Sequence, residues 1–224
     1  MKVVEGRVLA VLTGDIVDSS GLGNVGLQPV SELIENTGIR IREHFQNSIH
    51  AQVDVFRGDS WQMVVLEPAI SVRIGLYFRA LLQANFGIDS RVSIGFGSVD
   101  YLPMENISSG TGLAFTLSGQ GLEECLKLAR MNLNFPSSRM VLEGQGLNTI
   151  TRLIDLQAGR WTSSQAQAMA GALTGITQAD SAAEWQPDPV SQQAISQHLE
   201  KAGWSQIKGA LTYLEDAIPV VLAL

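Results

Sequence analysis

Cysteine, histidine and long apolar runs are all scarce in this sequence. Cys125 is the one cysteine among 224 residues, which excludes an intrachain disulfide and any zinc site built from several cysteines, and fits a reducing cytoplasm. The three histidines, His44, His50 and His198, lack the spacing of a shared metal site. The longest uncharged stretch, residues 161–179, is rich in Ser, Gln, Thr and Gly and lacks the apolar density of a membrane-spanning helix. We therefore expect a cytoplasmic protein without a membrane partner.

Positive charge is also in short supply. The chain carries 15 Lys and Arg against 22 Asp and Glu, a formal net charge of −7. Such a balance excludes a surface adapted as a whole to nucleic acid or to an anionic membrane, but it leaves room for a local basic patch. Hydrophobic residues make up 45% of the chain, as in an ordinary globular protein, and the length allows one large domain or two small ones.

The first two thirds of the chain alternate strand-like and helix-like patterns. The apolar run at 7–13 ends at Gly14-Asp15, and Pro29 suits the first turn of a following helix. Two β-rich runs flank residues 57–60, a pattern typical of a hairpin. The expected strands are 7–13, 51–56, 61–66, 91–99 and 139–142. One helix is expected to begin at 29–31, a second to include the apolar residues between 70 and 82, and a third to span 110–129.

This order is β-α-β-β-α-β with one extra helix and strand, the arrangement of a split βαβ unit. A doubly wound parallel sheet does not place two strands back to back, so that fold is excluded. The pattern predicts an α+β fold in which residues 1–148 form a ferredoxin-like domain.

Residues 149–224 have a helical pattern. Thr162 or Ser163 is suited to cap a helix over 161–173, and a capping threonine also begins a helix over 177–185. Two prolines in the turn at 186–189 interrupt the pattern before helices over 191–202 and 204–217. We predict a second, all-α domain that resembles a helix-turn-helix, with the boundary near residues 145–160.

Two aspartates stand at positions that the predicted topology brings together. Asp15 ends the first strand, and Asp59 lies in the turn before the third strand, which is antiparallel to the first in a split βαβ unit. Paired carboxylates can hold Mg²⁺ or Mn²⁺, which also accept phosphate oxygens as ligands. The backbone amides of Ile16, Val17 and Asp18 would then be placed to receive phosphate. The alternative is that both aspartates only stabilise turns.

Four segments together resemble the SatD family. They are Thr13-Gly14-Asp15-Ile16-Val17-Asp18-Ser19-Ser20, Phe56-Arg57-Gly58-Asp59-Ser60-Trp61-Gln62, Arg91-Val92-Ser93-Ile94-Gly95-Phe96-Gly97 and Gly110-Thr111-Gly112-Leu113-Ala114-Phe115. The family is similar to the catalytic domain of class III nucleotidyl cyclases and usually carries a C-terminal helix-turn-helix. The resemblance covers most of the chain in order and spacing, and it implies a protein of bacterial type.

The resemblance also implies roles for individual residues. Asp15 and Asp59 match the two metal-binding aspartates of the cyclases, and Ile16 and Val17 match the backbone that contacts phosphate.

The Asn and Arg with which a cyclase steadies the ribose and the developing charge fall on Thr116 and Gln120. Neither residue supplies a cation, and preorganised positive charge is among the largest contributions to phosphoryl transfer. The resemblance therefore implies binding of a nucleotide with Mg²⁺ or Mn²⁺ more than cyclisation. An active nucleotidyl cyclase or other phosphoryl-transfer enzyme stays open as an alternative if Arg57, Arg91 or a dimer partner supplies the cation.

A G-x-G-x-x-G sequence occurs at residues 21–26. The dinucleotide fingerprint requires these glycines immediately after a strand and at the start of a helix, with an acidic residue ending the next strand. Here six residues separate strand and glycines, and the helix begins only after Pro29. We reject a Rossmann site and expect a loop at the mouth of the proposed metal site.

The helix over 191–202 is the candidate recognition helix. Ile195 and Leu199 would turn inward. Ser and Gln can contact base edges, but residues 151–224 hold four Lys and Arg against seven Asp and Glu, and DNA binding usually requires phosphate neutralisation. Lys201, Lys208, Arg152 and Arg160 would have to lie on one side. The expected DNA-contacting residues are Ser191, Gln192, Gln193, Ser196 and Gln197.

The sequence thus predicts a regulatory protein with two parts. One is a degenerate cyclase-like domain that binds a metal-nucleotide, and the other is a helical module that binds DNA or a protein partner. We also expect a homodimer. A structural homodimer without a nucleotide site, in which the helices serve only for packing or dimerisation, is the remaining alternative.

Overall fold

The protein has an α+β fold built on one mixed five-stranded sheet. A computed structural model describes residues 7–22, 29–136 and 142–223. The sheet order is β2-β3-β1-β4-β5, with β1 antiparallel to both neighbours and β5 parallel to β4. The strands are β1 (Val8–Ile16), β2 (Asp54–Phe56), β3 (Ser60–Val65), β4 (Ser90–Ser98) and β5 (Met131–Asn134).

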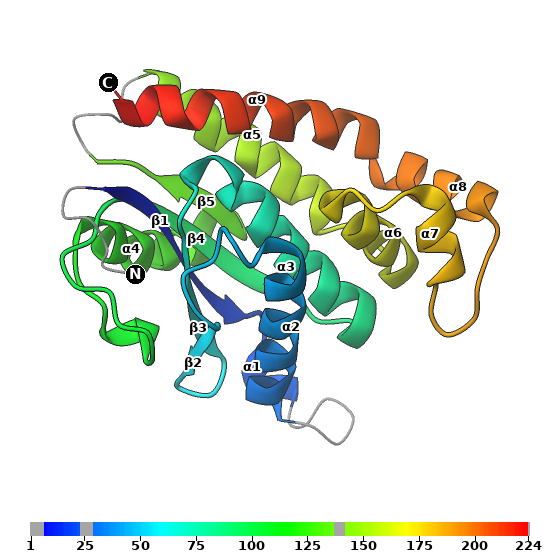
Figure 1. The fold of residues 1–224 in the computed structure, drawn as a ribbon, viewed down its shortest axis with the longest axis horizontal. Coiled ribbons are helices and arrows are strands. Elements are labelled where there is room, and N and C mark those ends of the chain that lie inside the picture. The colour runs from blue at the N-terminus through cyan, green and yellow to red at the C-terminus, as the bar shows by residue number, and fades with distance from the viewer. Residues whose placement is uncertain (1–6, 23–28, 137–141, 224) are drawn as a thin grey trace.

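Helices cover both faces of the sheet and extend beyond it (Figure 1). They are α1 (Ser19–Leu22), α2 (Val30–Phe45), α3 (Ser71–Phe86), α4 (Leu113–Leu128), α5 (Leu142–Ala158), α6 (Ser163–Thr174), α7 (Gln178–Ala183), α8 (Gln192–Ala202) and α9 (Trp204–Ala223). Two short 3₁₀ helices, Pro68–Ile70 and Ile107–Ser109, lie before α3 and α4.

The central strand β1 is a nearly continuous apolar run because both of its faces are covered. Ala10 and Leu12 join the core cluster that contains α2 and α3, whereas Leu9 and Val11 join the cluster under α4. Asp15 has the same parity as Leu9 and Val11, so it lies on the α4 face of the sheet.

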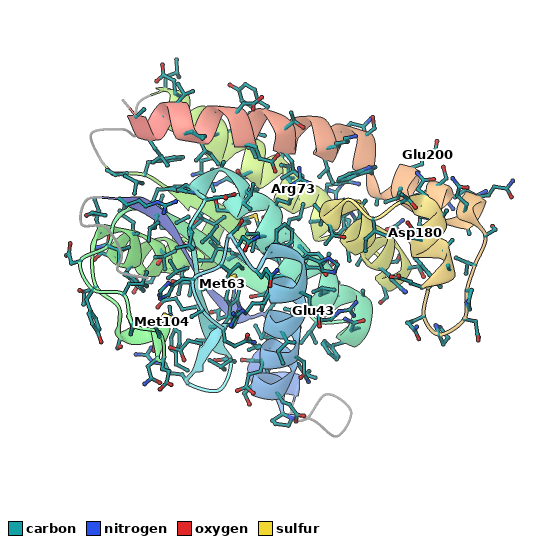
Figure 2. All side chains as sticks on the ribbon, in the orientation of Figure 1. Glu43, Met63, Arg73, Met104, Asp180 and Glu200 are labelled. Atoms are coloured by element: carbon teal, nitrogen blue, oxygen red, sulfur yellow. The ribbon has the colours of Figure 1, made fainter. Side chains whose placement is uncertain are left out.

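The helix α3 is buried on nearly all sides. The apolar stripe of its sequence predicts one buried face, but twelve of its residues, including Arg79 and Gln83, are buried. The sheet covers one side, and α6 packs on the other. Arg73, labelled in Figure 2, adds a link to α9. Its Nε and Nη2 donate to the two carboxylate oxygens of Glu215 at 2.6 and 3.1 Å.

The C-terminal helices continue the same core. Figure 1 shows α5 and α9 side by side across the top of the molecule and α6, α7 and α8 at one end. One hydrophobic cluster joins strands, α2, α3 and all the helices from α5 to α9, and α5 runs through residues 148 and 149, where the sequence predicts the domain boundary. No helix in the described ranges is long and apolar enough to cross a membrane.

The predicted elements are mostly present, with shifted ends. The antiparallel pairing of the first and third strands and the side-chain cap of Thr162 on α6 are confirmed. The strand expected at 51–56 is shorter, since it begins at Asp54. The strand expected at 139–142 is wrong at Leu142, which begins α5, while residues 139–141 lie outside the described residues.

The last strand of the sheet is instead β5, at Met131–Asn134. Met131 and Leu133 are buried in the main core, and the two asparagines face α4. Asn132 donates to the carbonyl of Gly121 at 2.8 Å, and Asn134 donates to Ser93 at 2.9 Å. Asparagine is depleted in strands, so the local sequence does not indicate one here.

Candidate functional site

The structure brings Asp15 and Asp59 to the same end of the sheet. Asp15 pairs in register with Ser60 across β1 and β3, which places it beside the turn that carries Asp59. The amide of Ile16 donates to the Asp59 carbonyl at 3.2 Å and fixes this approach. Arg57 and Gly58 have positive φ values of 56° and 86°, which turn the chain back tightly before Asp59.

Both carboxylates have partners within the protein. Arg91 Nη1 donates to Asp15 Oδ1 at 2.8 Å, and the two side chains are only 20% and 22% exposed. Burial raises the pKa of Asp15, Arg91 opposes this, and the nearby negative charge of Asp59 raises it further. Ser19 and Ser60 donate their hydroxyls to the two carboxylate oxygens of Asp59.

This donor set fits a hard divalent cation that keeps other ligands. No group of three or more His, Cys, Asp or Glu that could hold a metal occurs in the described part of the chain. Mg²⁺ is commonly held by one or two carboxylates together with water and substrate phosphates, so two aspartates suffice for such an ion. A site that needs several protein ligands, such as structural zinc, does not fit.

The backbone predicted to contact phosphate is engaged differently. The amide of Ile16 donates to the carbonyl of Asp59, as described above, and the amide of Val17 donates to the carbonyl of Asp89 at 2.9 Å. Asp18 has a positive φ of 56°, and its carbonyl accepts from Gly21. The Ile16 and Val17 amides therefore already have acceptors.

Thr116 and Gln120 lie on the outer side of α4. Both are exposed, and Thr116 Oγ1 donates to the carbonyl of Gly112 at 3.2 Å. The inner side of the helix carries Ser118, whose hydroxyl is 2.8 Å from that of Thr13. The structure does not bring Thr116 and Gln120 into contact with the acidic pair within one chain.

A cluster of arginines lies next to the acidic pair. It lines a cavity of about 570 Å³ between the ends of β1, β4 and α4 and the side of α5. Among the lining residues are Val17, Arg91, Cys125, Arg130, Arg152, Asp155 and Arg160. Burial raises the pKa of the Cys125 thiol to about 12, so this side chain is neutral.

A buried ion network supports the floor of this arginine cavity. The fully buried Arg79 of α3 donates to both carboxylate oxygens of Asp89 at 2.8 Å and to Asp155 at 2.6 Å. Arg130 adds a third contact to Asp89 at 2.8 Å. The ion pair with Arg79, aided by hydrogen bonds from Ser90 and Arg130, outweighs the effect of burial and lowers the pKa of Asp89 to about 2.

The sequence analysis names Arg91 as an alternative source of the cation at this site, but it predicts neither the arginine cavity nor its ion network. Its arginines come from three separate segments with no common motif, and Arg79 lies in an apolar helix where a core residue is expected. Arg79 among the apolar residues of this helix was nevertheless an unusual signal in the sequence. Arginine is almost never fully buried unless it is paired, so a core position for Arg79 implies a partner.

The predicted DNA-contacting face of α8 is solvent-accessible. Ser191, Gln192, Gln193, Ser196 and Gln197 are exposed, and Ile195 and Leu199 are buried as predicted. Ser191 serves as the N-cap, accepting from the amide of Ala194 at 3.2 Å.

The four cations of the C-terminal segment lie at three separate places. Arg152 and Arg160 line the arginine cavity, Lys201 lines a groove between α5 and α9, and Lys208 lines a pocket beside Arg73. Asp180 and Glu200 are exposed on α7 and α8, at one end of the molecule (Figure 2). The positive charge that DNA would need is therefore not gathered at α8.

Comparisons with known proteins add no family. The resemblance to the SatD family accordingly stays a prediction from the four sequence motifs. The chain matches no protein-family model and no curated protein sequence.

Proposed function

We propose that the protein is a regulatory protein that binds a nucleotide with Mg²⁺ or Mn²⁺ at Asp15 and Asp59. The observation that carries this proposal is the meeting of these two carboxylates at one end of the sheet, beside Arg91. The strand order β2-β3-β1-β4 supports a ferredoxin-like, cyclase-like assignment for the α+β part.

The residues present suggest how such a ligand would be held. A divalent cation, which would supply Lewis-acid charge for phosphate oxygens, would replace Arg91 as the counter-charge of Asp15. The guanidinium of Arg91 would then be available to a phosphate group. Ser19 already holds the Asp59 carboxylate in a fixed orientation.

We expect binding rather than turnover. Thr116 and Gln120 carry no charge and are exposed on the outer side of α4, so these two positions do not supply the cation that a cyclase has there. Formation of a cyclic nucleotide by the purified protein would overturn this part of the proposal and support the enzyme alternative.

Thermal unfolding with nucleotides, in the presence and absence of Mn²⁺, tests the site. A ligand at about 100 times its Kd stabilises the folded state by about 3 kcal/mol, which raises the melting temperature measurably. The wild type should respond, and Asp59→Asn should not. Asp188→Asn, which removes an exposed carboxylate far from the site in sequence, is the matched control and should respond fully.

An equal response from wild type and Asp59→Asn refutes the two-aspartate site. The lack of any response from wild type leaves the structural homodimer as the better explanation. Light scattering on the same samples measures whether the chain is a dimer, as we expect.

For the helical part, we propose a role in binding a partner whose access depends on nucleotide occupancy. The exposed Ser and Gln side chains of α8 support a contact surface, and the scattered cations favour a protein partner over DNA. A gel shift on random DNA at low salt tests the alternative, and clear retardation that disappears with salt would favour DNA.

A further inference from the structure

We propose that the arginine cavity is a binding site for a small, multiply charged phosphorylated anion, and that it works without a metal. This goes beyond the proposed function, because the site requires neither Asp59 nor a divalent cation. Its walls come from the start of β4, the residue before β5, and α5, so a ligand there would contact the sheet and the C-terminal helices together.

The first argument is uncompensated charge. Arg91 pairs with Asp15 and Arg130 pairs with Asp89, but Arg152 and Arg160 have no ion pair or side-chain hydrogen bond to any residue that the structure describes. Asp155, the one carboxylate among the described residues that line the cavity, already accepts hydrogen bonds from Arg79 and from the Arg130 amide.

The second argument is a buried donor without an acceptor. Arg152 Nε is inaccessible to solvent and makes no hydrogen bond, one of three such side-chain atoms among the described residues and the only charged one. A buried charged donor costs free energy unless it is paired. Arg152 itself is part-exposed and lines the cavity, so an anion there would meet a guanidinium whose charge no described residue neutralises.

The chemical class follows from the donors and the space. Guanidinium groups bind phosphate oxygens in pairs, with geometry that a lysine does not offer. Four guanidinium groups placed around one cavity suit a ligand with several phosphate oxygens more than one carboxylate. A volume of about 570 Å³ lies within the range of small-molecule sites and admits more than a single phosphate ion.

Titration calorimetry with sodium tripolyphosphate in the presence of a chelator tests the proposal on the full chain. The wild type should bind, and Arg152→Gln and Arg160→Gln should each bind about tenfold to a hundredfold more weakly, the loss expected for one charge-assisted hydrogen bond or two. Arg42→Gln, an exposed arginine of α2, is the control and should bind as the wild type does. Arg152→Lys should recover part of the affinity, because it restores the charge without the planar fork.

Each outcome decides between sites. The proposal is overturned if the wild type does not bind, or if both glutamine variants bind as tightly as Arg42→Gln. Loss of tripolyphosphate binding in Asp59→Asn with retention in Arg152→Gln would place the anion on the acidic pair and also overturn it. Equal binding of citrate would refute the phosphate class. Loss only in the arginine variants upholds the cavity even if no metal-nucleotide response is found.

Discussion

Removing the negative charge of Asp89 tests whether the buried ion network stabilises the fold. Its carboxylate lies between Arg79 and Arg130, each 2.8 Å away, and its pKa is about 2. Asp89→Asn keeps the shape of the side chain but leaves Arg79 with Asp155 as its remaining carboxylate partner. The variant is therefore expected to be less stable at neutral pH.

The lowered pKa of Asp89 gives one measure of the size of the effect. The difference between the ordinary value of 3.8 and about 2 corresponds to about 2 kcal/mol of folding free energy at neutral pH. Breaking a buried pair by removing one partner costs about 3–5 kcal/mol, because the other charge is left buried. We expect Asp89→Asn to lower the free energy of unfolding by about 2–5 kcal/mol.

The pH dependence has a definite sign. A carboxyl whose folded pKa is lowered stabilises the protein above its unfolded pKa, and this contribution is lost as the pH falls through the folded pKa. The gap between wild type and Asp89→Asn should thus be full at pH 7 and should shrink between about pH 4 and pH 2. About half of the pKa-linked part should remain at pH 3.

Urea unfolding followed by tryptophan fluorescence measures this gap. Trp61, Trp161 and Trp185 are buried and should report the transition. Asp188→Asn, which removes an exposed carboxylate, should change stability by less than about 0.5 kcal/mol. A gap that is absent at pH 7, or one that stays constant from pH 7 to pH 2.5, would refute the reasoning.

Three further predictions concern packing, capping and thiol reactivity. A Cβ at Gly95 would lie 2.3 Å from the carbonyl oxygen of Ala114, so Gly95→Ala should cost about 1–3 kcal/mol or more in urea unfolding. Gly119 lies on the same helix as Ala114, and a Cβ there would meet nothing within 4 Å. Gly119→Ala is therefore the control and should leave the free energy of unfolding unchanged or raise it. Thr162→Ala removes the N-cap of α6 and should lower the free energy of unfolding by about 1 kcal/mol, whereas an unchanged melting temperature would contradict the capping box. Burial raises the pKa of the Cys125 thiol to about 12, so it should react with a disulfide reagent at pH 8 about tenfold to a hundredfold more slowly in native protein than in urea, and equal rates would refute its burial.

The meeting of Asp15 and Asp59 could be predicted because it depends on topology alone. Once the order of strands and helices is known, the third strand must lie beside the first, and the residues at their shared end follow from it. The cap at Thr162 was equally predictable, since a capping threonine with Gln165 three residues later is a local signal.

The rest of the site depends on tertiary contacts that local patterns do not contain. Arg91, Arg130 and Arg152 approach one another only after β4, β5 and α5 have packed. The engagement of the Ile16 and Val17 amides depends on the positions of two distant carbonyls. Short strands with polar residues, such as β5, are fixed by their neighbour β4 and not by their own propensity.

The burial of α3 on nearly all sides has a consequence for dissecting the molecule. A chain truncated after residue 148 would lose α6 and most of α5, and with them the cover over the outer side of α3 and the Asp155 partner of Arg79. The fragment would expose an apolar helix to water and leave Arg79 with Asp89 as its remaining carboxylate partner, and it would tend to aggregate. The sheet therefore depends on the C-terminal helices for its own solubility, whatever separate tasks the two segments perform.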